Sequence, residues 1–117
     1  MTDESEPEKK EVSQKIQSIV GLDDLVHSPV RLALLMFLLP RAKATFIELQ
    51  MALGLTAGNL SSHIKKFEQN NFVYVQKAFV QAKPTTIIYL TPEGKEALIK
   101  YASIMTEAMK EIAETNE

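Results

Sequence analysis

Apolar residues recur every three or four positions after Thr45, which is the spacing of one face of a helix. Thr45 lies three residues before Glu48, and in this arrangement each side chain binds a backbone N–H that the start of a helix leaves open. Gly54 suits the left-handed conformation that ends a helix. The pattern predicts a short helix between Thr45 and Gly54, with its apolar positions at Leu49, Ala52 and Leu53.

A second helix is predicted over residues 57–69, with Thr56 as its N-cap. Leu60, Ile64 and Phe67 fall on one stripe of this helix, because residues i, i+4 and i+7 share a face. Two short helices that meet at a tight corner predict a helix-turn-helix. The remaining sides of the second helix are polar, and they carry Gly58, Asn59, Ser61, Ser62, Lys65, Lys66 and Gln69.

The chain before this unit predicts two more helices behind a disordered acidic tail over residues 1–7. Residues 8–21 form an amphipathic helix whose apolar stripe needs a partner. Residues 29–39 are apolar nearly all round, so this helix is expected at the centre of the core. Pro40 is expected to end it, and Arg31, its only charged residue, to reach solvent or pair with a carboxylate.

After the helix-turn-helix, residues 72–75 and 85–90 have the composition of strands. An exposed basic loop with Lys77 and Lys83 connects them. The pattern predicts a β-hairpin, either a wing that supports the helix-turn-helix or a generic surface hairpin.

A final helix is predicted over residues 92–113, with a tail over 114–117, because Thr91 and Pro92 are a cap and a favoured first residue. Its apolar residues alternate steps of three and four, as in a heptad seam, but for only two heptads. The seam predicts either a dimer contact or packing on the N-terminal helix of the same chain. The expected dimerisation residues are Val12, Ile16, Ile19, Leu98, Tyr101, Met105, Ala108 and Ile112.

Charge is distributed unevenly along the 117 residues, although the net charge is only −2. Residues 1–27 carry −4, residues 28–91 carry +5 and residues 92–117 carry −3. A basic middle between acidic ends favours a surface that faces nucleic acid.

Several classes of function find no support in the composition. The chain has no cysteine, and His27 and His63 lack carboxylate partners at metal-ligand spacing, so neither a metal site nor a cofactor is expected. No nucleophile elbow, phosphate loop or paired carboxylates indicate an enzyme. The longest apolar block, residues 32–39, is far shorter than a membrane span, and no signal peptide is recognised, so a cytoplasmic protein is expected.

The order helix, helix, helix, hairpin, helix resembles the winged helix-turn-helix transcriptional regulators of the MarR and ArsR type, especially their short prokaryotic members. The resemblance covers about residues 22–101. The expected fold is therefore mainly α with a small β-hairpin (α+β), in which residues 22–91 form the winged helix-turn-helix and residues 8–21 and 92–113 form a dimer handle. The matching segments are HSPVRLALL at 27–35, LTAGNLSSHIKKFEQNNFV at 55–73 and KPTTIIYLTPEGKEAL at 83–98.

The resemblance implies a homodimer on pseudo-palindromic double-stranded DNA. Helix 57–69 would enter the major groove, and the wing at about 77–84 would lie on the minor groove or backbone. Similar wings often carry Gly-Arg before the Lys-Pro pair, but this chain has Gln81 and Ala82 there. Similar regulators can hold a small-molecule effector, which no residue here identifies. The residues that would contact DNA are Thr56, Gly58, Asn59, Ser61, Ser62, Lys65, Lys66, Lys77 and Lys83.

The chemistry of the residues alone favours two kinds of DNA contact. The lysines would bind phosphates, and Asn59, Ser61 and Ser62 would bind base edges. A second hypothesis is a winged-helix module that binds another protein, because Phe79 in the hairpin is an aromatic residue expected on the surface.

Overall fold

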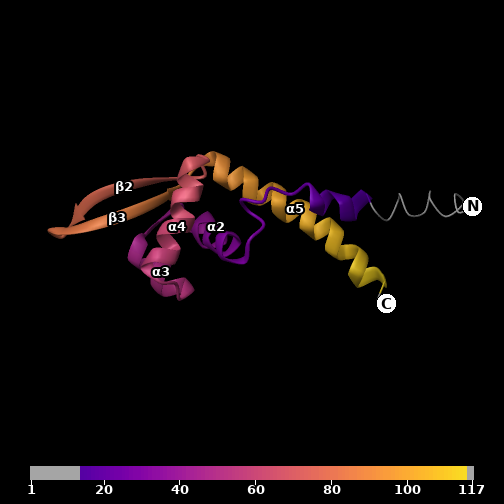
Figure 1. The fold of residues 1–117 in the computed structure, drawn as a ribbon, viewed down its shortest axis with the longest axis horizontal. Coiled ribbons are helices and arrows are strands. Elements are labelled where there is room, and N and C mark those ends of the chain that lie inside the picture. Colours follow the sequence, from indigo (N-terminus) through magenta and orange to yellow (C-terminus); the bar gives the residue numbers. More distant parts are fainter. Residues whose placement is uncertain (1–13, 116–117) are drawn as a thin grey trace, which may run out of the picture.

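The computed structural model describes residues 14–115, and it confirms the mixed α and β architecture (Figure 1). A helix that includes residues 14–20 comes first. Val12 and the predicted tail over 1–7 lie outside the described residues. The elements that follow are α2 (Pro29–Arg41), β1 (Lys43–Thr45), α3 (Phe46–Leu53), α4 (Ala57–Gln69), β2 (Val73–Val80), β3 (Lys83–Leu90) and α5 (Pro92–Thr115).

The sheet of the described chain has three antiparallel strands in the order β1-β3-β2. The sequence predicted only the hairpin of β2 and β3. β1 is three residues long, and its register with β3 pairs Ala44 with Ile88. Ala44 is buried there at 4% exposure, so β1 is held by a partner more than forty residues away rather than by its own pattern.

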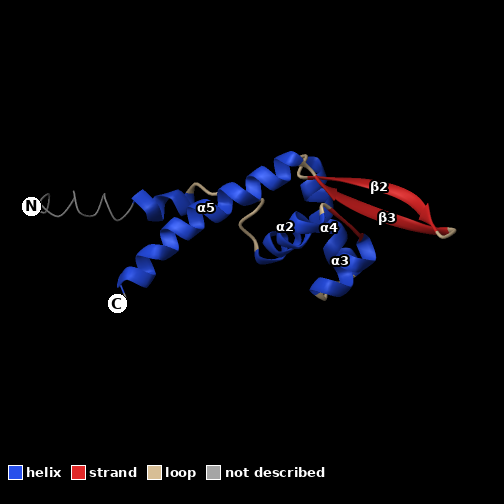
Figure 2. Cartoon of the chain, turned by 180° about the vertical axis from the view of Figure 1, so that it is seen from behind, coloured by secondary structure: helices blue, strands red, loops and turns tan. Residues whose placement is uncertain are grey.

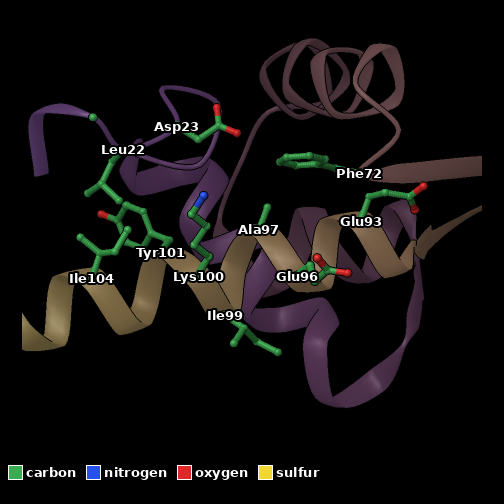
Figure 3. A pocket seen from close by; sticks show the side chains of 11 residues that line it. Leu22, Asp23, Phe72, Glu93, Glu96, Ala97, Ile99, Lys100, Tyr101 and Ile104 are labelled. Atoms are coloured by element: carbon green, nitrogen blue, oxygen red, sulfur yellow. The ribbon is translucent and has the colours of Figure 1, made fainter. Parts of the chain in front are cut away.

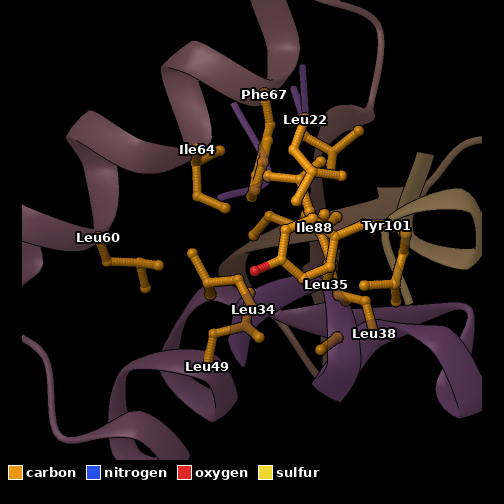
Figure 4. Packing of buried hydrophobic residues seen from close by; sticks show 14 residues of the cluster. Leu22, Leu34, Leu35, Leu38, Leu49, Leu60, Ile64, Phe67, Ile88 and Tyr101 are labelled. Atoms are coloured by element: carbon orange, nitrogen blue, oxygen red, sulfur yellow. The ribbon is translucent and has the colours of Figure 1, made fainter. Parts of the chain in front are cut away.

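One hydrophobic core joins the helices to the base of the sheet (Figure 4). As predicted, α2 lies at its centre, because Leu34, Leu35 and Leu38 are fully buried. α3 contributes Leu49, and the sheet contributes Val73 and Ile88. The stripe predicted on α4 is confirmed, since all three of its apolar residues are buried, namely Leu60, Ile64 and Phe67.

Local capping positions the corner between α3 and α4 as predicted. The Thr45 hydroxyl accepts from the Glu48 N–H at 3.0 Å, and the Glu48 carboxylate accepts from the Thr45 N–H at 2.8 Å. These bonds, with the Thr45 backbone bond first, hold the pKa of Glu48 below its usual value. Gly54 ends α3 at φ 64°, and the Thr56 hydroxyl caps α4 by accepting from the Asn59 N–H at 3.1 Å.

Pro40 does not end α2, contrary to the prediction. It lies inside the last turn, where its missing N–H removes one bond near a helix end. The helix closes at Ala42, whose φ is 69° and whose N–H donates to the Leu38 carbonyl at 2.7 Å. Arg41 adds a side-chain bond to the Phe37 carbonyl at 2.7 Å and places its guanidinium 3.7 Å from the Phe37 ring centroid.

The predicted dimer seam of α5 is divided between core and surface. Leu98 and Tyr101 belong to the core of their own chain at 4% and 8% exposure, and Ala108 is buried at 6%, so these three residues are not free for a partner. Ile19 and Met105 are half-buried against the same core. Ile16 and Ile112 remain exposed. α5 also runs through Thr115, so it includes residues 114 and 115, which were predicted to belong to the tail.

Candidate nucleic-acid interface

α4 presents its polar side to solvent along its whole length. Leu60, Ile64 and Phe67 face the core, in which Leu49 of the preceding helix, α3, also lies. The predicted DNA-contacting residues of this segment are all exposed, namely Thr56, Gly58, Asn59, Ser61, Ser62, Lys65 and Lys66.

The functional groups on this side are not used by the fold. Within residues 14–115, the side chains of Asn59, Ser61, Ser62, Lys65 and Lys66 form no hydrogen bond or ion pair. Polar side chains that a fold neither covers nor pairs are available to a ligand. Amide and hydroxyl groups match the donors and acceptors at base edges, and ammonium groups match phosphates.

Gly58 lies in the first turn of α4, where the fold has no need for a glycine. A Cβ at Gly58 would meet no atom within 4 Å apart from its chain neighbours and the backbone of its own helix, and no positive φ is found there. Glycine inside a helix costs about 0.5–1 kcal/mol relative to alanine. Because the fold does not require a glycine here, we interpret the absence of a side chain as room for another molecule to approach the backbone.

We therefore expect Gly58→Ala to raise the free energy of unfolding by about 0.5–1 kcal/mol and to weaken DNA binding. The methyl group removes backbone freedom in the unfolded chain but would occupy the space through which a bound duplex could approach the helix. Urea unfolding and fluorescence anisotropy with labelled duplex measure the two effects. A variant that gains both stability and affinity would show that the start of α4 stays away from DNA.

The hairpin is longer and its turn tighter than the sequence predicted. The strands continue through the expected loop, so Lys77 lies within β2 and Lys83 begins β3. Only Gln81 and Ala82 form the turn, with φ of 52° and 64°, as a two-residue type I′ turn requires. In Figure 2 the hairpin extends well past the helices, so its tip is free to reach a neighbouring molecule.

The two lysines of the hairpin lie on opposite faces of the sheet. Lys77 pairs with Thr86 and shares a face with the buried Val73, which is the side that α4 packs against. Lys83 shares the outer face with Tyr74 and Tyr89, whose rings stack at 4.6 Å. Both lysines are exposed, but only Lys77 lies on the face toward α4.

Comparison with known proteins decides the family. Residues 30–109, more than half of the chain, match the model of the winged helix DNA-binding domain. The chain belongs to the winged helix DNA-binding domain family. β2 and β3 are thus the wing of this domain, and α3 and α4 are its helix-turn-helix.

Relatives and solved structures agree with this assignment. The winged helix chain is 33% identical over 88 residues to the uncharacterized protein MJ0432 of Methanocaldococcus jannaschii, a match that covers 75% of this chain and 96% of the relative. It superposes on a transcriptional regulator homologue from Pyrococcus horikoshii with a TM-score of 0.78, at 33% identity, over 85% of this chain and 97% of the other. These matches confirm the resemblance to winged helix regulators that the sequence indicated.

A more distant neighbour shows the fold alone. The heme sensor protein PefR from Streptococcus agalactiae, solved in complex with heme, has a TM-score of 0.64 at 16% identity. The match covers 92% of this chain and 71% of PefR.

A hollow of about 600 Å³ lies between the turn at residues 21–23 and the first half of α5 (Figure 3). Leu22, Phe72 and Tyr101 supply part of its apolar lining, while Asp23 and Lys100 place charges at it. The volume is in the range of small-molecule sites. The sequence pattern did not indicate it, because its walls come from three separate segments.

The polar contacts of Arg31 were also not predicted. Its side chain was expected to reach solvent or a carboxylate, but it donates to two backbone carbonyls and lies against His63 of α4.

Among residues 14–115, no group of three or more potential metal ligands gathers in one place. Within the same residues, no helix combines the length and the apolar character that crossing a membrane requires.

Proposed function

We propose that this winged helix protein is a transcriptional regulator that binds specific sequences of double-stranded DNA as a homodimer. α4 is the recognition helix and enters the major groove, while the wing lies on the minor groove or backbone. The observation that carries the proposal is the uncovered and unpaired polar side of α4 within a winged helix domain. Such a regulator acts in the cytoplasm of a prokaryotic cell.

The residues divide by chemistry. Lys65, Lys66 and Lys77 carry positive charges on α4 and on the sheet face toward it, and Lys83 carries one on the outer face of the wing. Their ammonium groups suit phosphates. Base edges would be read by the short polar side chains of α4, for which Gly58 leaves room. Thr56 fixes the start of the helix through its cap. The short polar side chains are Asn59, Ser61 and Ser62.

The homodimer is supported by apolar side chains that lie exposed among residues 14–115. Met105, Met109 and Ile112 follow the i, i+4, i+7 spacing of one helix face, and the last two are 49% and 58% exposed. Ile16 and Val20 of the N-terminal helix are 51% and 82% exposed. A two-fold contact between two copies would bury these faces together.

An effector is a secondary part of the proposal. The hollow of Figure 3 lies where the turn at residues 21–23 meets α5, between the helix-turn-helix and the proposed dimer face. PefR was captured with heme. In the present chain a small molecule in the hollow would contact the turn at residues 21–23, Phe72 and α5, and would thereby change how these segments are held together.

The test is a selection of bound sequences from a random DNA library, followed by a salt titration on the selected duplex. If four lysines in each of two subunits reach phosphates, the logarithm of the binding constant falls with the logarithm of salt with a slope of about 7. Sedimentation equilibrium of the same sample should give the mass of a dimer. An absence of duplex binding at low salt would remove the proposal.

A second candidate function is protein binding through the wing. Phe79 is 75% exposed and Val80 is 48% exposed next to the turn, so apolar area is available there. The selection separates the two candidates, because a protein-binding module would enrich no sequence and Phe79→Ala would leave any duplex binding unchanged.

A further inference from the structure

Arg31 of α2 connects three segments of the domain with one guanidinium group. Its Nε donates to the Leu25 carbonyl at 2.6 Å and its Nη2 to the Asp24 carbonyl at 3.2 Å, both in the turn before α2. Its Nη1 lies 3.3 Å from Nδ1 of His63 in α4. Arginine suits this position because its planar fork holds several donors in fixed directions.

The turn whose carbonyls accept from Arg31 is also hydrogen-bonded to α5. Nδ1 of His27 lies 2.8 Å from the Tyr101 hydroxyl, and the two rings are 5.6 Å apart. Leu22 and Val26 of the same turn are buried in the core. Polar contacts therefore run from α5 through the turn and Arg31 to the recognition helix.

α4 needs such a directional contact because its other attachment is apolar. Leu60, Ile64 and Phe67 bury the helix, but apolar packing has little dependence on direction. A hydrogen bond weakens steeply when its angle changes, so the contact at His63 adds a directional constraint on the rotation of α4 about its axis. Ser62 precedes His63 directly, and a rotation there displaces the proposed reading side chains.

We propose that Arg31 is a positioning residue for sequence recognition: by donating to His63 it holds the reading side of α4 at a fixed angle to the α5 dimer handle. This inference rests on the proposed DNA-binding function. Arg31 itself lies on α2 and supports the side chains that would touch bases.

The contact requires a neutral His63. A neutral imidazole has one acceptor nitrogen for Arg31, whereas a protonated ring has two donors and places a second positive charge against the guanidinium. The charged groups that act on His63 are Arg31 from α2 and Lys66 from α4 itself. Burial first, and then these two cations, lower the pKa of His63 below its ordinary value.

The direction of the pH effect follows from this shift. Because the unfolded chain binds the proton more readily than the folded chain, the stability that neutral His63 provides is present above the ordinary histidine pKa. It is lost as the pH falls through the lowered pKa of the folded state. Sequence-specific affinity should fall over the same interval, because a protonated His63 can no longer accept from Arg31.

The experiment compares Arg31→Gln with Arg41→Gln, which removes the same charge from an exposed residue at the end of α2. Binding is measured to the duplex selected by the wild-type protein and to a scrambled duplex of equal composition. We expect Arg31→Gln to weaken binding of the selected duplex about tenfold or more, with no larger effect on the scrambled duplex than Arg41→Gln. Circular dichroism at the assay temperature verifies that each variant is folded.

A pH series supplies a readout that a purely structural role would not change. As the pH is lowered from about 7.5 to well below the ordinary histidine pKa of about 6.5, wild-type preference for the selected duplex should fall, whereas His63→Gln should keep it nearly constant. Glutamine keeps a neutral acceptor, so its affinity at the upper pH should stay within about threefold of wild type. His27→Gln removes the other histidine of the chain and should leave the pH response in place.

Two results would overturn the inference while leaving DNA binding intact. One is an equal loss for Arg31→Gln and Arg41→Gln on both duplexes, and the other is an unchanged pH response in His63→Gln. Failure of the wild-type protein to prefer any sequence would instead remove the proposed function, and the positioning role with it.

Discussion

Replacing Phe67 by alanine is expected to lower the free energy of unfolding by about 3–5 kcal/mol. Phe67 is fully buried near the C-terminal end of α4, and its ring stacks with that of Phe72 at 6.1 Å between centroids. The Phe72 N–H also donates to the Phe67 carbonyl at 2.9 Å, so the same residue directs the chain from α4 into β2. Removing the ring leaves a cavity where the helix-turn-helix meets the wing.

Urea unfolding followed by circular dichroism measures this loss. A domain of this size has a total stability of about 5–15 kcal/mol, so the variant is expected to unfold at much lower urea or to be partly unfolded in water. Phe79→Ala is the matched control, because Phe79 is 75% exposed and its removal should change stability by less than about 0.5 kcal/mol. A loss below about 1 kcal/mol for Phe67→Ala would mean that the core collapses around the missing ring.

The parts of the fold that the sequence predicted well are those with short-range causes. Thr45, Glu48 and Gly54 act on residues within one or two helical turns, so their identities alone locate the corner. The apolar stripe of α4 follows from helical spacing, and the opposite side of the helix is polar because it does not pack into the core. The exposed polar side of α4, which is the main part of the candidate interface, could therefore be predicted from the sequence.

The parts that the sequence missed depend on distant partners. Lys43 to Thr45 carry no strand pattern of their own and become β1 only because β3 has an open edge beside them. The wing strands pass through the predicted loop because Gln81 and Ala82 both adopt positive φ, which neither residue type favours. Arg31 finds carbonyls and His63 rather than a carboxylate, and nothing in residues 29–39 indicates that choice.

The C-terminal helix shows how one periodic pattern serves two purposes. Leu98 and Tyr101 near its start pack into the core of the chain, while Ile112 near its end is exposed. In Figure 1 the distal half of α5 lies away from α2, α3 and α4, at the opposite end of the molecule from the wing. Periodicity identifies an apolar face, but it does not say which element covers each part of it.

We expect Ser62→Ala to change the sequence preference of DNA binding and Lys65→Ala to change its overall strength. Both residues are exposed on α4, and neither side chain has a partner among the described residues. Ser62→Ala should change which base is preferred at one position of each half-site, by about 1–3 kcal/mol. Lys65→Ala should weaken selected and scrambled duplexes alike and reduce the magnitude of the salt slope by about 1 per subunit.

Repeating the library selection with each variant, alongside salt titrations, separates these outcomes. Ser103→Ala and Lys95→Ala are matched controls, because they make the same chemical changes at exposed positions of α5. If Lys65→Ala altered the preferred sequence while Ser62→Ala left it unchanged, the lysine would be reading a base and α4 would lie rotated from the orientation proposed here. If the α5 controls had effects as large as the α4 variants, net charge rather than the exposed side of α4 would govern binding, and the assignment of the recognition helix would fail.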